Sequence, residues 1–200
     1  TNPDTHFIAT ANNKIVGDDY PYFISVDSAP GYRYARIAEC LRPLTNATAE
    51  DFVALQADRL SLFAREFVPQ VIAACDDERF LRDNPTLAKA LDYLRMWDYR
   101  LEPDSIAATI HATNRDVIMR SLLEPWLGEA LIKEMFSVGR GGAAHAARLR
   151  SHLVEYIQAN DTRLLDPRDP QRASWTVVLR MTMQVTVSTL RALLGDEMSQ

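Results

Sequence analysis

The chain has 200 residues, of which 47% are hydrophobic and 24% charged, and its formal net charge is −5. This length and apolar content are enough for one substantial core, or for a core with an attached subdomain. Acidic and basic residues are interleaved, which argues against a nucleic-acid partner, and no run approaches the ~20 apolar residues of a membrane span.

The first segment has the composition of a β-strand followed by turns. Residues 6–11 (HFIATA) are short, apolar and rich in β-formers, so they predict a strand that ends at Asn12 and Asn13. Residues 17–19 (GDD) then supply turn chemistry, and Tyr20 before Pro21 keeps the backbone extended. The opening residues TNPDTHF suggest a cut through a longer protein.

Helical spacing begins after residue 31. Residues 32–41 predict a short helix that Pro43 stops, and Thr48 is placed to cap the next helix. Apolar residues at spacings of three and four predict one long helix over 51–75, bent at Pro69.

Further helices follow in the rest of the chain. They are predicted at 84–97, with Pro85 in the first turn, and then at 104–126, 128–136 and 143–160. The polar residues 161–174 are the best candidate for an exposed loop.

Residues 177–188 (VVLRMTMQVTVS) fit two patterns. Their alternation of apolar and polar side chains favours a half-buried strand, yet Trp175, Leu179 and Thr182 also lie on one helical face. Gly195 is placed to end such a helix. The pattern alone leaves helix and strand equally open.

Few residues are arranged for catalysis or metal binding. Cys40 and Cys75 lie in apolar helical runs, which favours buried free thiols over a disulfide. The four histidines are scattered without carboxylates at ligand spacing, so a metal site is not predicted. Thr1 is either an N-terminal nucleophile or merely the first residue of a fragment, and the second interpretation is favoured.

Asn12 and Arg33 are the candidate site residues. An asparagine at the end of a strand can direct its amide N–H to a developing oxyanion, although an Asn-Asn pair is also common turn chemistry. Arg33 and Arg36 lie one helical turn apart, and each either stiffens a nearby site or pairs with Glu39 or Asp27 at the surface.

Four blocks of the sequence resemble one family. They are ATANNKIVGDDYPYFIS, APGYRYARI, TAEDFVALQADRLSLFAREFVP and LRMWDYRLEPDSIAATIH, and their order and spacing are similar to those in the β-chain of the penicillin acylase family. That family belongs to the N-terminal nucleophile hydrolases, whose precursors cut themselves into α and β chains. The resemblance implies a mainly α fold: a helical subdomain with a short leading β-strand, inserted in an αββα sandwich.

The resemblance also implies an activity. The chain would be part of an amidohydrolase that cleaves an acyl group from a linear amide, such as a β-lactam amide or an acyl-homoserine lactone. The nucleophile is a Ser outside this chain, Asn12 is an oxyanion donor, and Arg33 supports the site. Gln56, Asp58 and Ser61 match a family block in which internal hydrogen bonding is expected.

The domain boundaries and partners follow from the same resemblance. Residues 1–28 would belong to the catalytic core and residues 29–200 to the helical subdomain. The partners would be an acyl amide substrate, the rest of the β-chain and the α-chain, in a periplasmic or secreted enzyme. By this resemblance residues 177–188 are expected to be helical.

The sequence departs from the family in two respects. It lacks the Ser that begins the family's β-chain, so these residues alone are expected to be inactive. Some members bind calcium through an Asp where this chain has Ile24, and Asp27 is offset from that position, so no cofactor or metal ligand is predicted here. The alternative function is a non-catalytic, all-helical module that binds a ligand or a partner.

Overall fold

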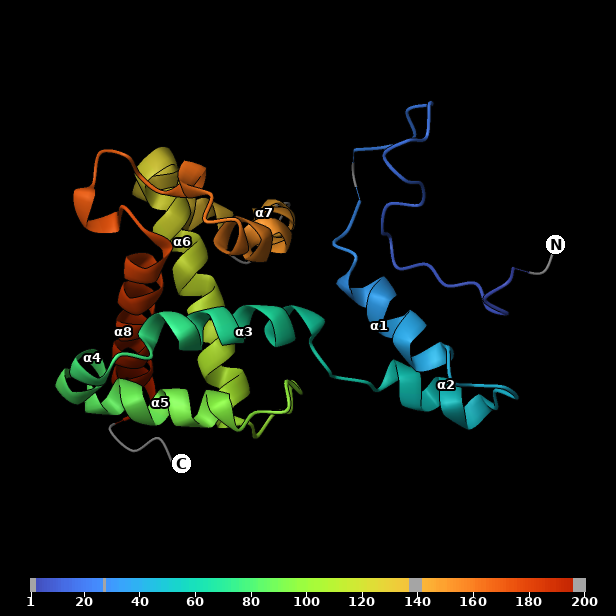
Figure 1. Ribbon diagram of the computed structural model, residues 1–200, viewed down its shortest axis with the longest axis horizontal. Helices are drawn as coiled ribbons and strands as arrows, with labels where there is room; N and C mark the ends of the chain where they lie inside the picture. The colour runs from blue at the N-terminus through green and yellow to red at the C-terminus, as the bar shows by residue number, and fades with distance from the viewer. Residues whose placement is uncertain (1–2, 27, 137–141, 196–200) are drawn as a thin grey trace. The chain divides into compact units, whose positions relative to one another are not determined.

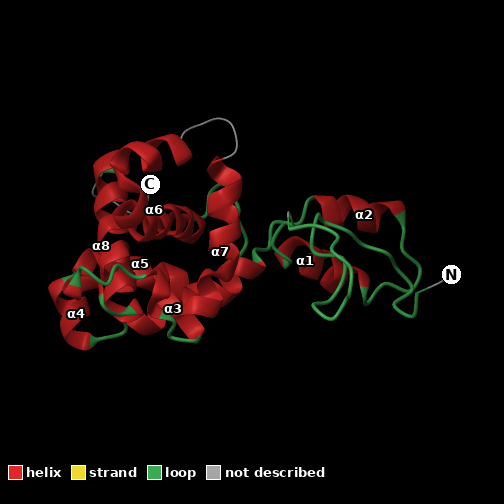
Figure 2. Cartoon of the chain, turned by 90° about the horizontal axis from the view of Figure 1, so that it is seen from above, coloured by secondary structure: helices red, strands yellow, loops and turns green. Residues whose placement is uncertain are grey.

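The computed structural model describes residues 3–26, 28–136 and 142–195, and this part of the chain contains eight α-helices and no β-strand (Figures 1 and 2). The mainly helical prediction is therefore confirmed. The chain forms two compact units, Thr1–Leu62 and Phe63–Gln200, which are described separately below. The predicted boundary at residue 28 concerns a catalytic core in a larger enzyme and stays a prediction.

The first unit carries two helices, α1 (Tyr32–Leu41) and α2 (Ala49–Gln56). Helix α1 has the predicted bounds. Helix α2 begins where Thr48 predicts: the Thr48 hydroxyl accepts a hydrogen bond from the Asp51 amide, and the Asp51 carboxylate accepts one from the Thr48 amide at 2.8 Å. This reciprocal capping satisfies two backbone donors that helix geometry leaves without partners.

The single long helix predicted over residues 51–75 is wrong. The chain leaves the helical conformation after Gln56 and re-enters it as α3 (Leu62–Cys75), which continues through Pro69. The apolar spacing misled because the α2 half of the pattern is not buried: Val53 is 67% exposed, whereas Phe67 and Val71 in α3 are fully buried. Because α2 has no core to cover its apolar face, extending it into α3 would bury no further apolar surface and would not stabilise the helix.

The prediction of a strand over residues 6–11 is also wrong for this chain when it is described without the rest of a larger protein. The backbone at 7–10 forms no ladder, and the β-type pairing next to it is an isolated parallel bridge between Asn13 and Ala29. A strand needs a neighbour for its N–H and C=O groups, and the described residues of this unit supply none alongside residues 7–10. The turn at 17–19 is confirmed by a hydrogen bond from the Tyr20 amide to the Gly17 carbonyl.

The second unit is a helical bundle built around α6 (Ile106–Met135) and α8 (Trp175–Leu194), with α5 (Pro85–Arg95) packed against both (Figure 1). Short α4 (Glu78–Asp83) precedes α5, and α7 (Gly142–Gln158) packs on α6. Pro85 is the first residue of α5, as predicted. A break at Gly128, whose φ is +75°, divides α6 between the two helices predicted there.

Residues 177–188 are helical, which confirms the expectation drawn from the resemblance. Leu179 and Met183 in α8 are buried, whereas Val177 and Val185 are more than 40% exposed, so the alternating pattern did not describe the buried face. A buried hydrogen bond of 3.1 Å from Asn114 Nδ2 to the Thr186 hydroxyl joins α6 to α8. Buried amide and hydroxyl groups need such partners, so this bond fixes the register of the two helices.

Helix α8 also meets the length and composition of a membrane span, although the sequence pattern did not predict one. Five of its apolar residues are buried within the bundle: Trp175, Val178, Leu179, Met183 and Val187.

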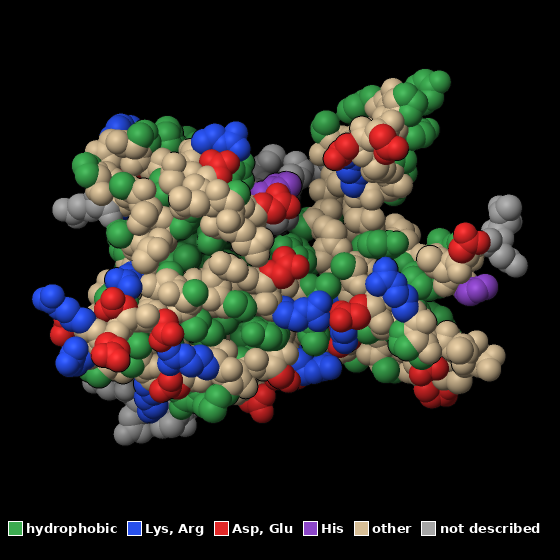
Figure 3. Space-filling model, in the orientation of Figure 1, with side chains coloured by type: hydrophobic (Ala, Val, Ile, Leu, Met, Phe, Trp, Pro, Cys, Tyr) green, Lys and Arg blue, Asp and Glu red, His purple; other side chains and the backbone are tan. Residues whose placement is uncertain are grey.

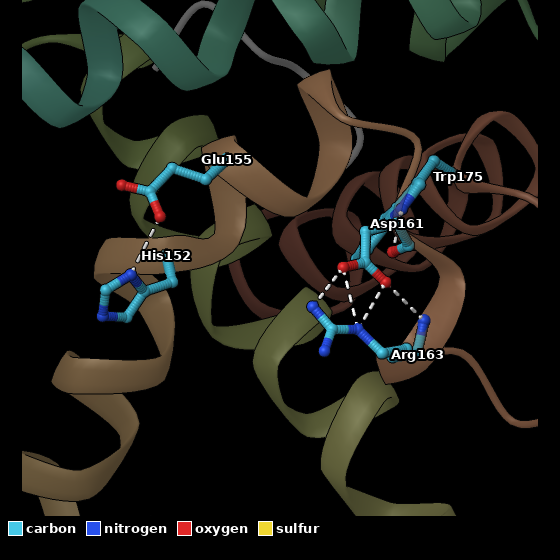
Figure 4. A network of polar contacts seen from close by, with 5 residues as sticks. All are labelled: His152, Glu155, Asp161, Arg163 and Trp175. Atoms are coloured by element: carbon cyan, nitrogen blue, oxygen red, sulfur yellow. Dashed lines mark hydrogen bonds and ion pairs between the residues drawn. The ribbon is translucent and has the colours of Figure 1, made fainter.

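The loop at 161–174 is tied to the bundle more firmly than its polar composition predicts (Figure 4). Two short 3₁₀ turns, Thr162–Leu164 and Pro170–Arg172, lie within it. The indole N–H of Trp175 donates to the Asp161 carbonyl at 2.9 Å, and Arg163 donates through Nε and Nη2 to the Asp161 carboxylate. Leu165 is buried, so this loop adds to the core rather than merely crossing the surface.

Cys40 and Cys75 are not joined in a disulfide, as predicted. Cys75 at the end of α3 is fully buried, and burial raises the pKa of its thiol to about 11. Cys40 in α1 is half-buried. A thiol held protonated in an apolar core is chemically inert, so Cys75 has a packing role.

His111 is a buried titratable group of the second unit, as Cys75 is. It is 2% exposed, and its ring lies 5.4 Å from that of Trp97 and within about 6 Å of those of Phe63 and Phe67. Burial, with smaller contributions from Arg115 and Arg150, lowers the pKa of His111 from 6.5 to about 3. The imidazole is therefore neutral in the folded state at all but strongly acidic pH.

Acidification is expected to destabilise the second unit through His111. The unfolded chain takes up a proton near pH 6.5 and the folded chain only near pH 3, so stability is full above pH 6.5 and falls by up to about 1.4 kcal/mol per pH unit below it. Urea unfolding at about pH 7.5 and about pH 4.5 measures this slope. His111→Phe should lose less stability on acidification than wild type does.

The control for this measurement is His152→Gln. His152 in α7 is 60% exposed and lies 3.0 Å from Glu155, so its substitution should leave the acid slope close to that of wild type (Figure 4). Equal slopes for wild type and His111→Phe would contradict the assignment of the effect to His111.

Candidate functional site

Asn12 lies where the extended segment of the first unit turns. Its φ is +59°, in the left-handed region that asparagine tolerates better than most residues. Its backbone carbonyl accepts a hydrogen bond of 2.7 Å from the Ala29 amide, which joins the two ends of the 13–28 loop. The Asn12 backbone is therefore fixed on one side by the turn and on the other by Ala29.

The neighbouring Asn13 has the role of a turn residue. Its side-chain oxygen accepts from the Ala11 amide at 3.1 Å, and its side-chain NH₂ donates to the Lys14 carbonyl at 2.9 Å. Local bonds of this kind are what an asparagine contributes to a turn. Of the Asn-Asn pair, Asn13 thus uses its amide for local structure, and Asn12 does not.

Arg33 fixes the orientation of the Asn12 side chain. From the second residue of α1, its Nη2 donates to the Ala11 carbonyl at 2.8 Å and to Asn12 Oδ1 at 2.9 Å. A guanidinium has donors only, so the atom of Asn12 that faces it must be the carbonyl oxygen. The NH₂ group then points elsewhere, and no described residue accepts a hydrogen bond from it.

A hollow of about 420 Å³ adjoins this amide in the first unit. Residues between 10 and 28 line it, among them Asn12, Tyr20, Tyr22 and Ile24. Tyr22 is 72% exposed and Tyr20 45%, so the wall is open to solvent. The hollow thus combines an amide donor with aromatic surface.

Arg36 links α1 to the segment that follows α2. Its Nε lies 2.6 Å from Asp58 Oδ2 and its Nη2 3.1 Å from Asp58 Oδ1, while Nη1 donates to Glu39 at 3.0 Å. These carboxylates raise the pKa of Arg36 above its usual value, with the hydrogen bonds to Asp58 the largest cause. The surface pairing proposed for Arg36 with Glu39 is confirmed, but Asp58 is the principal partner.

The remaining candidates are not gathered at this site. Asp58 makes the internal hydrogen bonds expected of the family block, whereas Gln56 is exposed. Thr1 and Asp27 lie outside the described residues, so neither the nucleophile interpretation nor a pairing of Asp27 is described by the structure.

Metal binding has no support in the part of the chain that the structure describes. No three His, Cys, Asp or Glu side chains gather there as a ligand set. Ile24, at the position where some family members have a calcium ligand, has no oxygen in its side chain and is half exposed. These residues do not fit a calcium ion, and no chemical step is assigned to one.

Sequence reasoning missed two partners in this site. The Ala11 carbonyl that accepts from Arg33 carries no signal in the sequence, because every residue has such a group. The pairing of Arg36 with Asp58 spans 22 residues and was signalled only by a charged residue within the apolar spacing of a predicted helix. The charge of Asp58 within that apolar spacing was the signal in the sequence.

Comparison with known proteins identifies the family. The model of the penicillin amidase family matches residues 1–200, the whole of the chain. Penicillin acylase 2 proenzyme of Pseudomonas sp. (strain SE83) is 30% identical over 120 residues, which are 59% of this chain and 15% of that relative. The chain thus aligns with a small part of that much longer protein, and by the match along its full length it belongs to the penicillin amidase family, a family of hydrolases.

Proposed function

We propose that the chain is part of an amidohydrolase that cleaves an acyl group from a linear amide. The nucleophile is an N-terminal Ser that lies outside these residues, and Asn12 donates a hydrogen bond to the oxyanion. The substrate belongs to the acyl amides, the class that the family's name implies. The rest of the β-chain and the α-chain would complete the site.

The observation that carries this proposal is the orientation of the Asn12 amide. Arg33 holds Oδ1 at 2.9 Å and thereby leaves Nδ2–H₂ as the outward-facing donor. An oxyanion site needs a neutral donor that is fixed before the charge develops, because a donor that must reorient loses much of its effect. The left-handed backbone of Asn12 and its bond to Ala29 supply the same rigidity in the main chain.

The reaction follows from this arrangement. The Ser hydroxyl attacks the amide carbonyl carbon and gives its proton to the α-amine of the same residue. The carbonyl oxygen becomes an oxyanion, to which Asn12 Nδ2 and other donors of the complete enzyme bind. The C–N bond then breaks, the amine leaves with the proton, and water releases the acyl group from the Ser.

The exposed apolar side chains of the first unit support a place within a larger protein (Figure 3). Ile8 is 83%, Phe23 81% and Val26 85% exposed in this unit. Large apolar side chains left this exposed are expected where another part of a protein covers them. In the complete enzyme, a neighbouring strand of the core would also supply the partners that residues 7–10 lack, and the predicted strand would form there.

The first test replaces the proposed donor. In the complete enzyme, Asn12→Ala is expected to lower kcat for chromogenic acyl amides by about 100- to 1,000-fold, because one oxyanion donor is lost. Asn13→Ala is the matched control: it removes the same group one residue away, where the amide serves the turn, and should retain most of its turnover.

The outcomes of this test separate the candidate functions. Equal turnover by wild type and a folded Asn12→Ala variant would assign Asn12 to the turn alone. Absence of hydrolysis by the wild-type enzyme across a broad panel of acyl amides would instead favour the non-catalytic helical module.

A second test concerns the residue that orients the donor. Arg33→Met keeps an unbranched stem of the side chain and loses both hydrogen bonds, so the Asn12 amide is free to rotate and kcat should fall. In an Asn12→Ala background the same substitution should lower kcat little further, since Arg33 acts through Asn12. Arg42→Met, at the exposed end of α1, is the control and should leave kcat unchanged.

A further inference from the structure

Helix α1 is held in place by little apolar packing. Of its ten residues, Ala38 is the buried one. Its N-cap, Gly31, provides no side-chain hydrogen bond, and its first turn has no acidic residue. A helix of this length is marginal without tertiary contacts, so polar bonds to other segments must fix its position.

Arg36 provides such a bond through both arms of its guanidinium. Nε and Nη2 meet the two oxygens of Asp58 at 2.6 and 3.1 Å, the parallel geometry in which an arginine and a carboxylate bind most strongly. The side chains are 21% and 12% exposed, so this pair is more enclosed than Lys14 with Asp18 or Arg36 with Glu39. A pair of this kind defines distance and direction, since either charge left alone would be poorly solvated.

The local backbone places Asp58 for this contact. The apolar spacing predicts a helix through Asp58, yet the chain leaves the helical conformation at Ala57 and resumes it at Leu62. The Asp58 carboxylate therefore comes from a non-helical segment and reaches α1 across 22 residues of sequence. The break in the predicted helix is thus the feature that presents this carboxylate to Arg36.

The contact lies one helical turn from the arginine that orients the proposed oxyanion donor. Arg33 and Arg36 are three residues apart, so they project from neighbouring positions on one side of α1, about 4.5 Å apart along its axis. Arg33 reaches Ala11 and Asn12, and Arg36 reaches Asp58. A rotation or slide of α1 would therefore displace the Arg33 guanidinium from Asn12.

We propose that Arg36 and Asp58 are positioning residues. Their contact prevents α1 from rotating about its axis or sliding along it, so that Arg33 holds the Asn12 amide in its donor orientation. This inference rests on the proposed function, because it acts through Asn12. Asp58 and Arg36 touch neither the substrate nor the reacting atoms, and their effect on catalysis passes through Arg33.

The experiment uses the complete, processed enzyme and a chromogenic acyl amide. Asp58→Asn keeps the shape of the side chain and removes its charge, and should lower kcat by about 10- to 100-fold with KM little changed, as expected when a catalytic group is displaced by about 1 Å. Glu39→Gln is the matched control: Glu39 also contacts Arg36, but from within α1, so this contact does not join the helix to the segment that carries Asp58. Its kcat should stay near that of wild type.

A second measurement separates positioning from general destabilisation. In an Asn12→Ala background, Asp58→Asn should lower kcat little further, because the donor that it serves is already absent. A merely structural role would lower kcat by the same factor in both backgrounds, and that result would overturn the inference. So would an unchanged kcat in Asp58→Asn when Asn12→Ala itself is impaired.

Failure of the proposed function can be distinguished from failure of the positioning role. If Asn12→Ala retains wild-type kcat, the oxyanion assignment fails whatever the kcat of Asp58→Asn.

If Asp58→Asn yields no folded enzyme, Arg36→Lys and Asp58→Glu provide the same test, since each keeps both charges and alters the bidentate geometry. Each should lower kcat in the wild-type background and leave it unchanged in Asn12→Ala, and any other pattern would contradict the inference.

Discussion

The hydrogen bonds of Arg33 to the Ala11 carbonyl and to Asn12 Oδ1 are the constraint on which the candidate site depends. They connect a helix to a turn that has no β-sheet to hold it, and they decide which end of the Asn12 amide faces outward. A guanidinium is suited to this task because it is always charged and can only donate. The candidate site therefore depends on Arg33, a residue that takes no part in any bond-making step of the proposed reaction.

The two units differ in what holds them together. The second unit has a conventional core, in which α6 and α8 bury apolar side chains around the bond between Asn114 and Thr186. The first unit buries little beyond Ala11 and Ala38 and depends instead on charged hydrogen bonds. Such bonds are directional, so they specify geometry well even where they add little stability. Residues that must be placed accurately are thus found where polar contacts, rather than packing, determine the structure.

Most of the helices were predictable because their signals are local. The capping box at Thr48, the Pro at the start of α5 and the Gly128 break act within one turn of helix, and each was readable from spacing. The two wrong elements depended on distant partners. Residues 6–11 have strand composition but no neighbouring strand here, and the helix over 51–75 is interrupted where Asp58 meets a residue from another helix. Composition cannot report a partner that lies far away in the sequence.

The candidate site was predictable to the same extent. The residue types and order that resemble the penicillin acylase family pointed to Asn12 and Arg33, but not to the bond between them. That bond distinguishes the roles of the two asparagines. An Asn-Asn pair by itself indicates a turn, but here a guanidinium holds one amide and the other amide bonds to its own turn. Asp58 shows the reverse case, in which a residue that interrupts a helical pattern pairs with an arginine of α1. A polar residue that breaks a strong local pattern is therefore worth testing as the partner of a distant charge.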